Sequence, residues 1–186
     1  MSNNQKNIQF CGFGGQGIIL SSVIFGTAAV QGAGLNAVQT QSFGSEARGG
    51  ECQAELILSE KEIKSPLADQ IDLLVAMSQP AMEKYLSRLK TDKTIVIDPG
   101  LVEKPNRNDI NIVKVNAREI AEKIGPEIVA NMVMLGFLQG ATNIFTKENL
   151  LTTIEKSVNE KFVEVDLRAA KKGIELAEKM DISLEV

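Results

Sequence analysis

The sequence lacks histidine and tryptophan and contains only two cysteines among its 186 residues. A Ser-His-Asp or Cys-His catalytic system needs a histidine base, so both systems are excluded. Zinc sites built on histidine are excluded as well, and two cysteines cannot supply a four-thiolate zinc or iron–sulfur site within one chain. We therefore expect this chain to carry no catalytic residue and no metal site of its own.

The two cysteines, Cys11 and Cys52, stand far apart and form no CxxC motif, which indicates buried thiols in a reducing compartment. Aromatic residues make up only 4% of the chain, and the 24 acidic and 20 basic residues are well mixed, with a net charge of −4. We therefore expect no nucleic-acid binding. The polar N-terminus and the lack of a long apolar run predict a cytoplasmic protein with no signal peptide and no membrane span.

Hydrophobic periodicity alternates between the spacings of strands and helices, which is typical of an α/β fold. Residues 51–58 alternate between apolar and polar side chains, which predicts an antiparallel or edge strand. We expect a Rossmann-like three-layer sandwich with a mostly parallel sheet and a helical C-terminal part. The expected strands are residues 8–12, 37–41, 51–58, 71–77, 94–97 and 110–115. The expected helices are residues 17–31, 80–89, 118–124, 127–142, 146–159 and 165–180.

A glycine-rich turn, GFGGQG, links the first strand to the first helix. Its candidate binding residues are Gly12, Gly14, Gly15, Gln16 and Gly17. Glycines let the backbone approach an anion, and the amides at a helix N-terminus favour negative charge. The dinucleotide interpretation lacks an acidic residue at the end of the second strand, where the sequence reads VQTQS over 38–42. A phosphate-bearing ligand, a partner's backbone and simple tight packing all remain open, and the amide side chain in this turn could face a ligand or cap the helix.

A second loop, SFGSEARGG over 42–50, follows the second strand, so in a parallel sheet it would reach the same edge as the glycine-rich turn. Arg48 could bind phosphate or carboxylate with two parallel hydrogen bonds. Equally, Arg48 could pair internally with Glu46, or the loop could be exposed without a ligand. The candidate residues here are Ser42, Gly44, Glu46, Arg48, Gly49 and Gly50.

Four segments in this order and spacing resemble the gamma subunit of 2-oxoacid:ferredoxin oxidoreductases. They are the two loops, DLLVA over 72–76, and Gly125 followed by NMVMLG over 131–136. The resemblance covers about residues 7–180, so residues 1–186 are expected to form a single gamma-subunit domain. The second loop is most similar to that of the 2-oxoglutarate and 2-oxoisovalerate members.

The resemblance implies a Rossmann-like subunit that packs on alpha and beta subunits, with a ferredoxin-like delta subunit completing the complex. The complex would oxidatively decarboxylate a 2-oxoacid, 2-oxoglutarate to succinyl-CoA by the loop similarity, and pass electrons to ferredoxin or another acceptor. Thiamine diphosphate, magnesium and iron–sulfur clusters would belong to other subunits, while both loops of this chain would help to shape the CoA region or contact partners. This chain alone would bind no cofactor.

Two other functions stay open from the residues themselves. The chain could be a stand-alone nucleotide-binding protein, or an assembly scaffold whose loops contact only other subunits. The very apolar helix expected over 127–142 suits a subunit of a complex, and it equally suits the central core of this chain.

Overall fold

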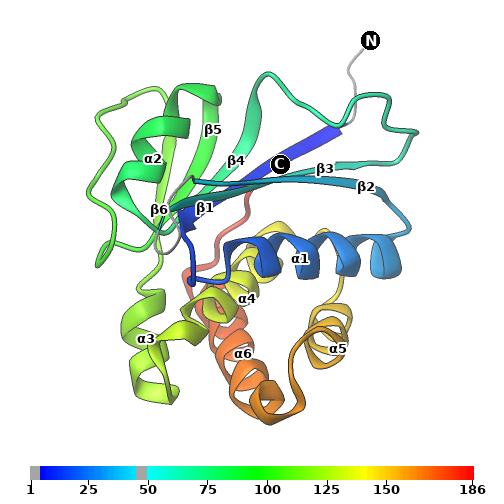
Figure 1. Cartoon of the computed structure of the whole chain (residues 1–186), viewed down its shortest axis with the longest axis vertical. Coiled ribbons are helices and arrows are strands. Elements are labelled where there is room, and N and C mark those ends of the chain that lie inside the picture. Colours follow the sequence, from blue (N-terminus) through cyan, green and yellow to red (C-terminus); the bar gives the residue numbers. More distant parts are fainter. Residues whose placement is uncertain (1–4, 45–49) are drawn as a thin grey trace.

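The computed structural model describes residues 5–44 and 50–186, which fold into a six-stranded sheet and six α-helices (Figure 1). The strands are β1 (Gln5–Phe13), β2 (Asn36–Phe43), β3 (Glu51–Ser59), β4 (Ile71–Ala76), β5 (Leu89–Ile97) and β6 (Asn111–Lys114). The helices are α1 (Ile18–Ala33), α2 (Gln79–Tyr85), α3 (Ala117–Ile124), α4 (Ala130–Thr142), α5 (Lys147–Ser157) and α6 (Val163–Met180). Short 3-10 turns occur at Leu86–Arg88, Glu127–Val129 and Glu160–Phe162.

The strand order is β2-β3-β1-β4-β5-β6, and the pairs β1–β4, β4–β5 and β5–β6 are parallel. Strand β3 runs antiparallel to both of its neighbours, β1 and β2. The predicted α/β class, with a mostly parallel sheet and one antiparallel strand, is confirmed. The edge position belongs to β2, because β3 lies inside the sheet. Strands β1 and β2 still point the same way, so their carboxyl ends reach the same sheet edge.

One face of the sheet is covered by α1, α4, α5 and α6, which lie together on one side of it in Figure 1. Phe10, Phe25 and Leu56 belong to the apolar core between this helical layer and the sheet. Helix α4 is buried along nearly its whole length, as its all-round apolar pattern predicted, and it serves as the central core helix. Helices α4 and α6 touch backbone to backbone, because a Cβ added at Gly136 would lie 1.9 Å from the Ala170 carbonyl oxygen.

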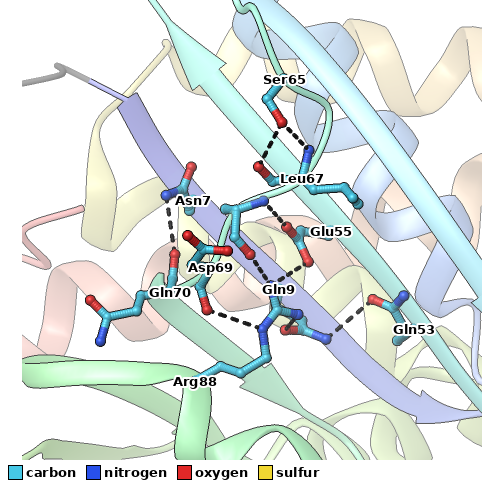
Figure 2. Close-up of polar contacts among 10 residues, drawn as sticks. Asn7, Gln9, Gln53, Glu55, Ser65, Leu67, Asp69, Gln70 and Arg88 are labelled. Carbon is cyan, nitrogen blue, oxygen red and sulfur yellow. Dashed lines mark hydrogen bonds and ion pairs between the residues drawn. The ribbon is translucent and has the colours of Figure 1, made fainter.

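The other face of the sheet is covered by α2 over β1 and β4, while β1 and β3 also carry a buried polar network there (Figure 2). Arg88 forms an ion pair of 2.8 Å with Glu55, whose side chain is only 4% exposed. The second Glu55 oxygen accepts a hydrogen bond of 2.8 Å from the Ala68 amide, and Arg88 Nη1 donates to Gln9 at 3.1 Å. This ion pair and these hydrogen bonds therefore hold the segment that precedes β4 against the polar side of β1 and β3.

Most element boundaries differ from the sequence expectation by one to three residues, and the larger differences have physical causes. The helix predicted over 80–89 ends at Tyr85, and β5 begins at Leu89 instead of residue 94, because Leu89 pairs with Ile71 ahead of a register shift in the β4–β5 ladder. The helix predicted from residue 127 begins as a 3-10 turn and becomes α-helical at Ala130. Within residues 5–44 and 50–186, no helix has the length and apolar character needed to cross a bilayer.

Candidate functional site

The glycine-rich turn connects the carboxyl end of β1 to the N-terminus of α1. Gly17 is the N-cap residue of α1 and adopts a left-handed conformation with φ of 72°. A Cβ at this position would lie 2.2 Å from Nδ2 of Asn131, which is buried at the start of α4. Both the backbone conformation and the close approach therefore require glycine at position 17.

Gln16 holds this turn from inside. Its Oε1 accepts a hydrogen bond of 2.7 Å from the Phe13 amide, and its Nε2 donates one of 2.9 Å to the Met77 carbonyl oxygen, just beyond β4. A Cβ on Gly12 would lie 2.5 Å from the same Oε1. The Gln16 side chain thus joins the ends of β1 and β4, and it makes no side-chain hydrogen bond as a cap of α1.

The structure brings the two loops together at one sheet edge. The Gly14 amide donates a hydrogen bond of 2.9 Å to the Gly50 carbonyl oxygen, and the Gly44 amide donates one of 2.6 Å to the Glu51 carbonyl oxygen. Ser42 lies on β2 near this end, opposite Gln53 of β3. Gly15 has a φ of 98° and faces open space at the tip of the turn. Of the predicted candidates, Glu46, Arg48 and Gly49 lie outside the described residues.

A cavity of about 280 Å³ lies beside the glycine-rich turn. It is lined by Gly15, Gln16, Met77, Leu101, Arg118, Glu127, Ile128 and Ala130. Arg118 Nε forms ion pairs with Glu127 at 2.8 Å and with Glu122 at 3.2 Å. The Arg118 backbone amide donates to the buried carboxylate of Asp98 at 2.7 Å, which fixes the first turn of α3 against the end of β5. A cation is therefore positioned at the rim of a cavity that the turn's backbone also lines.

Sequence reasoning missed both Arg118 and Asn131 as candidate site residues. Arg118 is distant in sequence from either loop and reaches the cavity only because β5 and β6 carry α3 to this edge. Asn131 is 4% exposed, and its Nδ2 lies 2.2 Å from where a Cβ on Gly17 would stand. Its sequence signals were a polar residue in the most apolar helix and its place at the head of NMVMLG over 131–136, one of the segments that carry the family resemblance.

Both cysteines are buried, and burial raises the pKa of the Cys11 thiol and of the Cys52 thiol. Neither thiol is therefore activated as a nucleophile at neutral pH. Among the residues that the structure describes, no three His, Cys, Asp or Glu side chains group together as a metal site would need. The backbone amides at the start of α1 suit the binding of an anionic group, whereas Arg118 beside them is already ion-paired with Glu122 and Glu127.

The model of the pyruvate ferredoxin/flavodoxin oxidoreductase family matches residues 7–176. The chain belongs to this family. Within the family, it is 41% identical to 2-oxoglutarate synthase subunit KorC of Methanothermobacter marburgensis over 179 residues, which cover 92% of this chain and 96% of that protein.

Two solved oxidoreductase structures have the same fold. The gamma subunit of keto/oxoacid ferredoxin oxidoreductase from Geobacter sulfurreducens is 37% identical, with a TM-score of 0.81, and the match covers 94% of this chain and 99% of that one. A 2-oxoglutarate:ferredoxin oxidoreductase from Magnetococcus marinus, with 2-oxoglutarate, coenzyme A and succinyl-CoA bound, is 23% identical, with a TM-score of 0.86. That match covers 98% of this chain and 33% of the Magnetococcus chain. The predicted family, fold class and role as an oxidoreductase subunit are confirmed.

Proposed function

We propose that this chain is the gamma subunit of a complex that oxidises 2-oxoglutarate to succinyl-CoA and carbon dioxide, with ferredoxin or another carrier accepting the electrons. The observation that carries the proposal is the 41% identity to a 2-oxoglutarate synthase subunit over nearly the full length of both proteins. Residues 1–186 would act as one gamma-subunit domain in this complex. The free thiols of Cys11 and Cys52 agree with a reducing cytoplasm.

The edge formed by the two loops would hold an anionic part of CoA. The glycine-rich turn leads into α1, a helix of 16 residues whose first amides have no intrahelical partner and carry positive partial charge. Gly15 offers open space above these amides, and Arg118 stands at the rim of the adjoining cavity. By the sequence resemblance alone, Arg48 would supply a second cation for the same anionic group. Gln16 would be a positioning residue, because both ends of its amide already bind backbone groups.

Decarboxylation and electron transfer would take place on partner chains. This sequence has no histidine, and its cysteines are too few for an iron–sulfur cluster. By the family resemblance, thiamine diphosphate, magnesium and the clusters would be supplied by alpha, beta and ferredoxin-like delta subunits. Exposed apolar side chains support a partner contact along α1 and the end of β2. They are Leu20, Val23, Val30 and Phe43, exposed by 36%, 41%, 43% and 65%.

The experiment compares the assembled complex with variants of this chain. The gene is co-expressed with its neighbouring subunit genes, and 2-oxoacid-dependent reduction of a viologen dye is measured over a range of CoA concentrations. Arg48→Ala and Arg118→Ala should each raise the apparent KM for CoA about tenfold, as expected for loss of a charge-assisted hydrogen bond. The apparent KM for 2-oxoglutarate should stay the same, because that substrate would bind on other subunits.

Arg168→Ala is the matched control, because Arg168 is exposed on α6, away from the loops. An unchanged KM for CoA in both arginine variants, with the complex intact, would contradict the CoA assignment and leave the loops as a scaffold. Rapid turnover by the isolated chain would contradict the subunit role. Calorimetry with NAD, NADP and FAD tests the stand-alone alternative, for which micromolar binding would be required.

A further inference from the structure

The two edges of the sheet differ in how they are protected against pairing with another strand. Edge strand β6 has four residues and ends in Lys114. Edge strand β2 has eight residues, NAVQTQSF, with no proline and no charged side chain, and its ladder with β3 runs from Asn36 to Phe43 without a register shift. Natural edge strands are usually short, charged, bulged or covered, because a long regular edge pairs readily with another strand. Of the two edges, β2 is therefore the one suited to accept a further strand.

The hydrogen bonds around β3 show which backbone groups of β2 face outward. The Gly44 amide donates to the carbonyl oxygen of Glu51 directly opposite, and the Gly14 amide donates to Gly50 on the other side of β3. Because alternate residues bond to each neighbour in an antiparallel ladder, the even-numbered residues of β2 bond to β3. The odd-numbered residues then direct their amides and carbonyl groups away from the sheet. No described strand lies beyond β2 to pair with these groups.

The same odd-numbered residues turn their side chains toward α1. Gln39 lies opposite Leu56, which belongs to the core beneath α1. A cavity of about 260 Å³ lies between this face of β2 and α1, and its lining includes Ala37, Gln39, Val23 and Val30. Val23 and Val30 lie about two turns apart on one side of α1, and both are exposed. A strand added beside β2 would therefore place alternate side chains against an apolar side of α1.

We propose that β2 pairs with β2 of a second copy of this chain, antiparallel and about a two-fold axis at Thr40. In this register, outward-facing residues meet outward-facing residues, because Gln39 of one copy lies opposite Gln41 of the other and Ala37 lies opposite Phe43. The most exposed aromatic side chain of β2, Phe43, then covers the small Ala37 of the other copy and the cavity beside it. The strand is thus complementary to itself, as a two-fold interface requires.

This pairing assigns an occupant to the exposed apolar side chains of α1 and β2. A row of outward amides and carbonyl groups is satisfied by an extended strand, which a helix or a small ligand cannot supply. The strand carries no charge, so two copies meet without repulsion. Both α1 helices would lie on the same side of the joined sheet, where their exposed valines face each other across the axis. The contact does not depend on the proposed CoA role, and in the assembled enzyme it would join two sets of subunits.

The first test is sedimentation equilibrium of the full chain. A reversible monomer–dimer equilibrium is expected, with a Kd in the micromolar range. Phe43→Ala should raise this Kd at least about tenfold, because the change removes an apolar contact from both halves of the interface. Leu67→Ala is the matched control, an apolar residue 69% exposed in the segment before β4. A chain that stays monomeric at its highest soluble concentration, or equal effects of the two variants, would overturn the proposal.

A proline variant tests the backbone pairing itself. The Gln41 amide faces outward, so Gln41→Pro removes a donor from the free edge and leaves the ladder with β3 intact. Gln41→Pro should raise the Kd of the dimer about tenfold, whereas Gln41→Ala, which keeps the amide, should change it less than about threefold. Equal values for the two variants would show that the edge of β2 does not form the contact.

Cross-linking tests the register and keeps the proposal falsifiable if the proline variant fails to fold. Thr40 meets its own copy on the axis as a non-hydrogen-bonded pair, with Cα atoms ~4.5 Å apart, so Thr40→Cys should form a disulfide-linked dimer on mild oxidation. The control is Ser42→Cys, because the two copies of Ser42 would lie ~14 Å apart along the strands. The natural cysteines are buried and do not compete. Equal cross-linking of the two variants would overturn the register.

Hydrogen exchange distinguishes a second copy from a strand of another subunit. In the isolated chain, the outward amides of β2 should exchange more slowly as the protein concentration rises through the Kd. Protection of these amides that is absent from the isolated chain at every concentration and present in the assembled complex would overturn the proposal in favour of another subunit's strand. Activity plays no part in these measurements, so their failure is separate from failure of the CoA assignment.

Discussion

The two faces of the sheet are stabilised in different ways. On one face, α4 and α6 meet at glycines and bury an almost wholly apolar core. On the other face, β1 and β3 place Gln9 and Glu55 under Arg88, so a buried charge pair and its hydrogen bonds stand where apolar packing would otherwise be. The stability of the first, or helical, face depends on the shape of its side chains and on close contact between helices. The stability of the second, or polar, face depends on each charged or polar group keeping its partner.

The largest effect should come from breaking the close contact on the helical face. A Cβ added at Gly173 would lie 1.9 Å from the Val133 carbonyl oxygen, which no side-chain rotation can relieve. We expect Gly173→Val to lower the free energy of unfolding by about 3 kcal/mol, measured by urea denaturation. Lys171→Val is the control for helix propensity, since Lys171 is exposed on the same helix and should lose less than ~1 kcal/mol. Equal losses of stability in Gly173→Val and Lys171→Val would mean that α4 and α6 can move apart at little cost.

On the polar face, removing one partner should cost more than removing both. Arg88→Met leaves Glu55 charged and 4% exposed, so we expect a loss of about 2 kcal/mol, less than for a fully buried pair because Arg88 is 29% exposed. The double variant Glu55→Met/Arg88→Met should be more stable than Arg88→Met alone. Urea denaturation of the natural protein, the two single variants Glu55→Met and Arg88→Met, and the double variant gives the coupling between the two sites.

An exposed ion pair provides the control for that cycle. Lys172 and Glu175 lie 2.6 Å apart with side chains 55% and 59% exposed, so Lys172→Met should change stability by less than ~0.5 kcal/mol.

Limited proteolysis of Arg88→Met adds a local measurement, because Arg88 also holds the segment that contains Ala68. If Arg88→Met leaves both stability and cleavage near Lys64 unchanged, the polar face does not depend on this pair.

The sequence predicted the helical face far better than the polar face. Apolar residues all round 127–142 were enough to identify a buried helix, because a helix that is apolar on every side can be predicted from its hydrophobicity and its helical spacing alone. Glu55 and Gln53 alternate with apolar residues, which revealed a strand with two unlike faces, but nothing local indicated Arg88 as the partner of Gln9, 79 residues away. At the site, the glycine-rich composition of the two loops identified them from the sequence. Arg118 lies near them only because of the order of the strands in the sheet, and hydrophobic periodicity does not predict strand order.

The cysteines allow the two faces to be probed separately. Cys11 belongs to the apolar cluster under α2, whereas Cys52 belongs to the core under α1 and α4. Burial raises the pKa of both thiols, so a maleimide should modify them in the native protein at least about a hundredfold more slowly than in urea. Single-cysteine variants Cys11→Ala and Cys52→Ala separate the two rates. Cys11 should react more slowly, since it is fully buried and Cys52 is 5% exposed.

Rapid native labelling of Cys11 would show that the polar face opens locally. Repeating the measurement in Arg88→Met sharpens the comparison, because loss of the network should speed the labelling of Cys11 more than that of Cys52. Equal acceleration of both thiols would indicate global unfolding instead of opening of one face.

The smallest effect concerns a charge on the otherwise apolar helical face. Asp166 lies in the first turn of α6 and is 7% exposed, and burial raises the pKa of its carboxyl above the usual value. A raised pKa means that the native state binds this proton more tightly than the unfolded state, so the ionised carboxylate lowers stability at neutral pH. Asp166→Asn should therefore be more stable than the natural protein at pH 7, by thermal denaturation. That advantage should shrink as the pH falls through the native pKa and vanish below the unfolded value of about 3.9, whereas Glu164→Gln, an exposed neighbour, should show no such trend. A pH-independent difference would mean that the carboxylate is solvated, and that the helical face admits water at the start of α6.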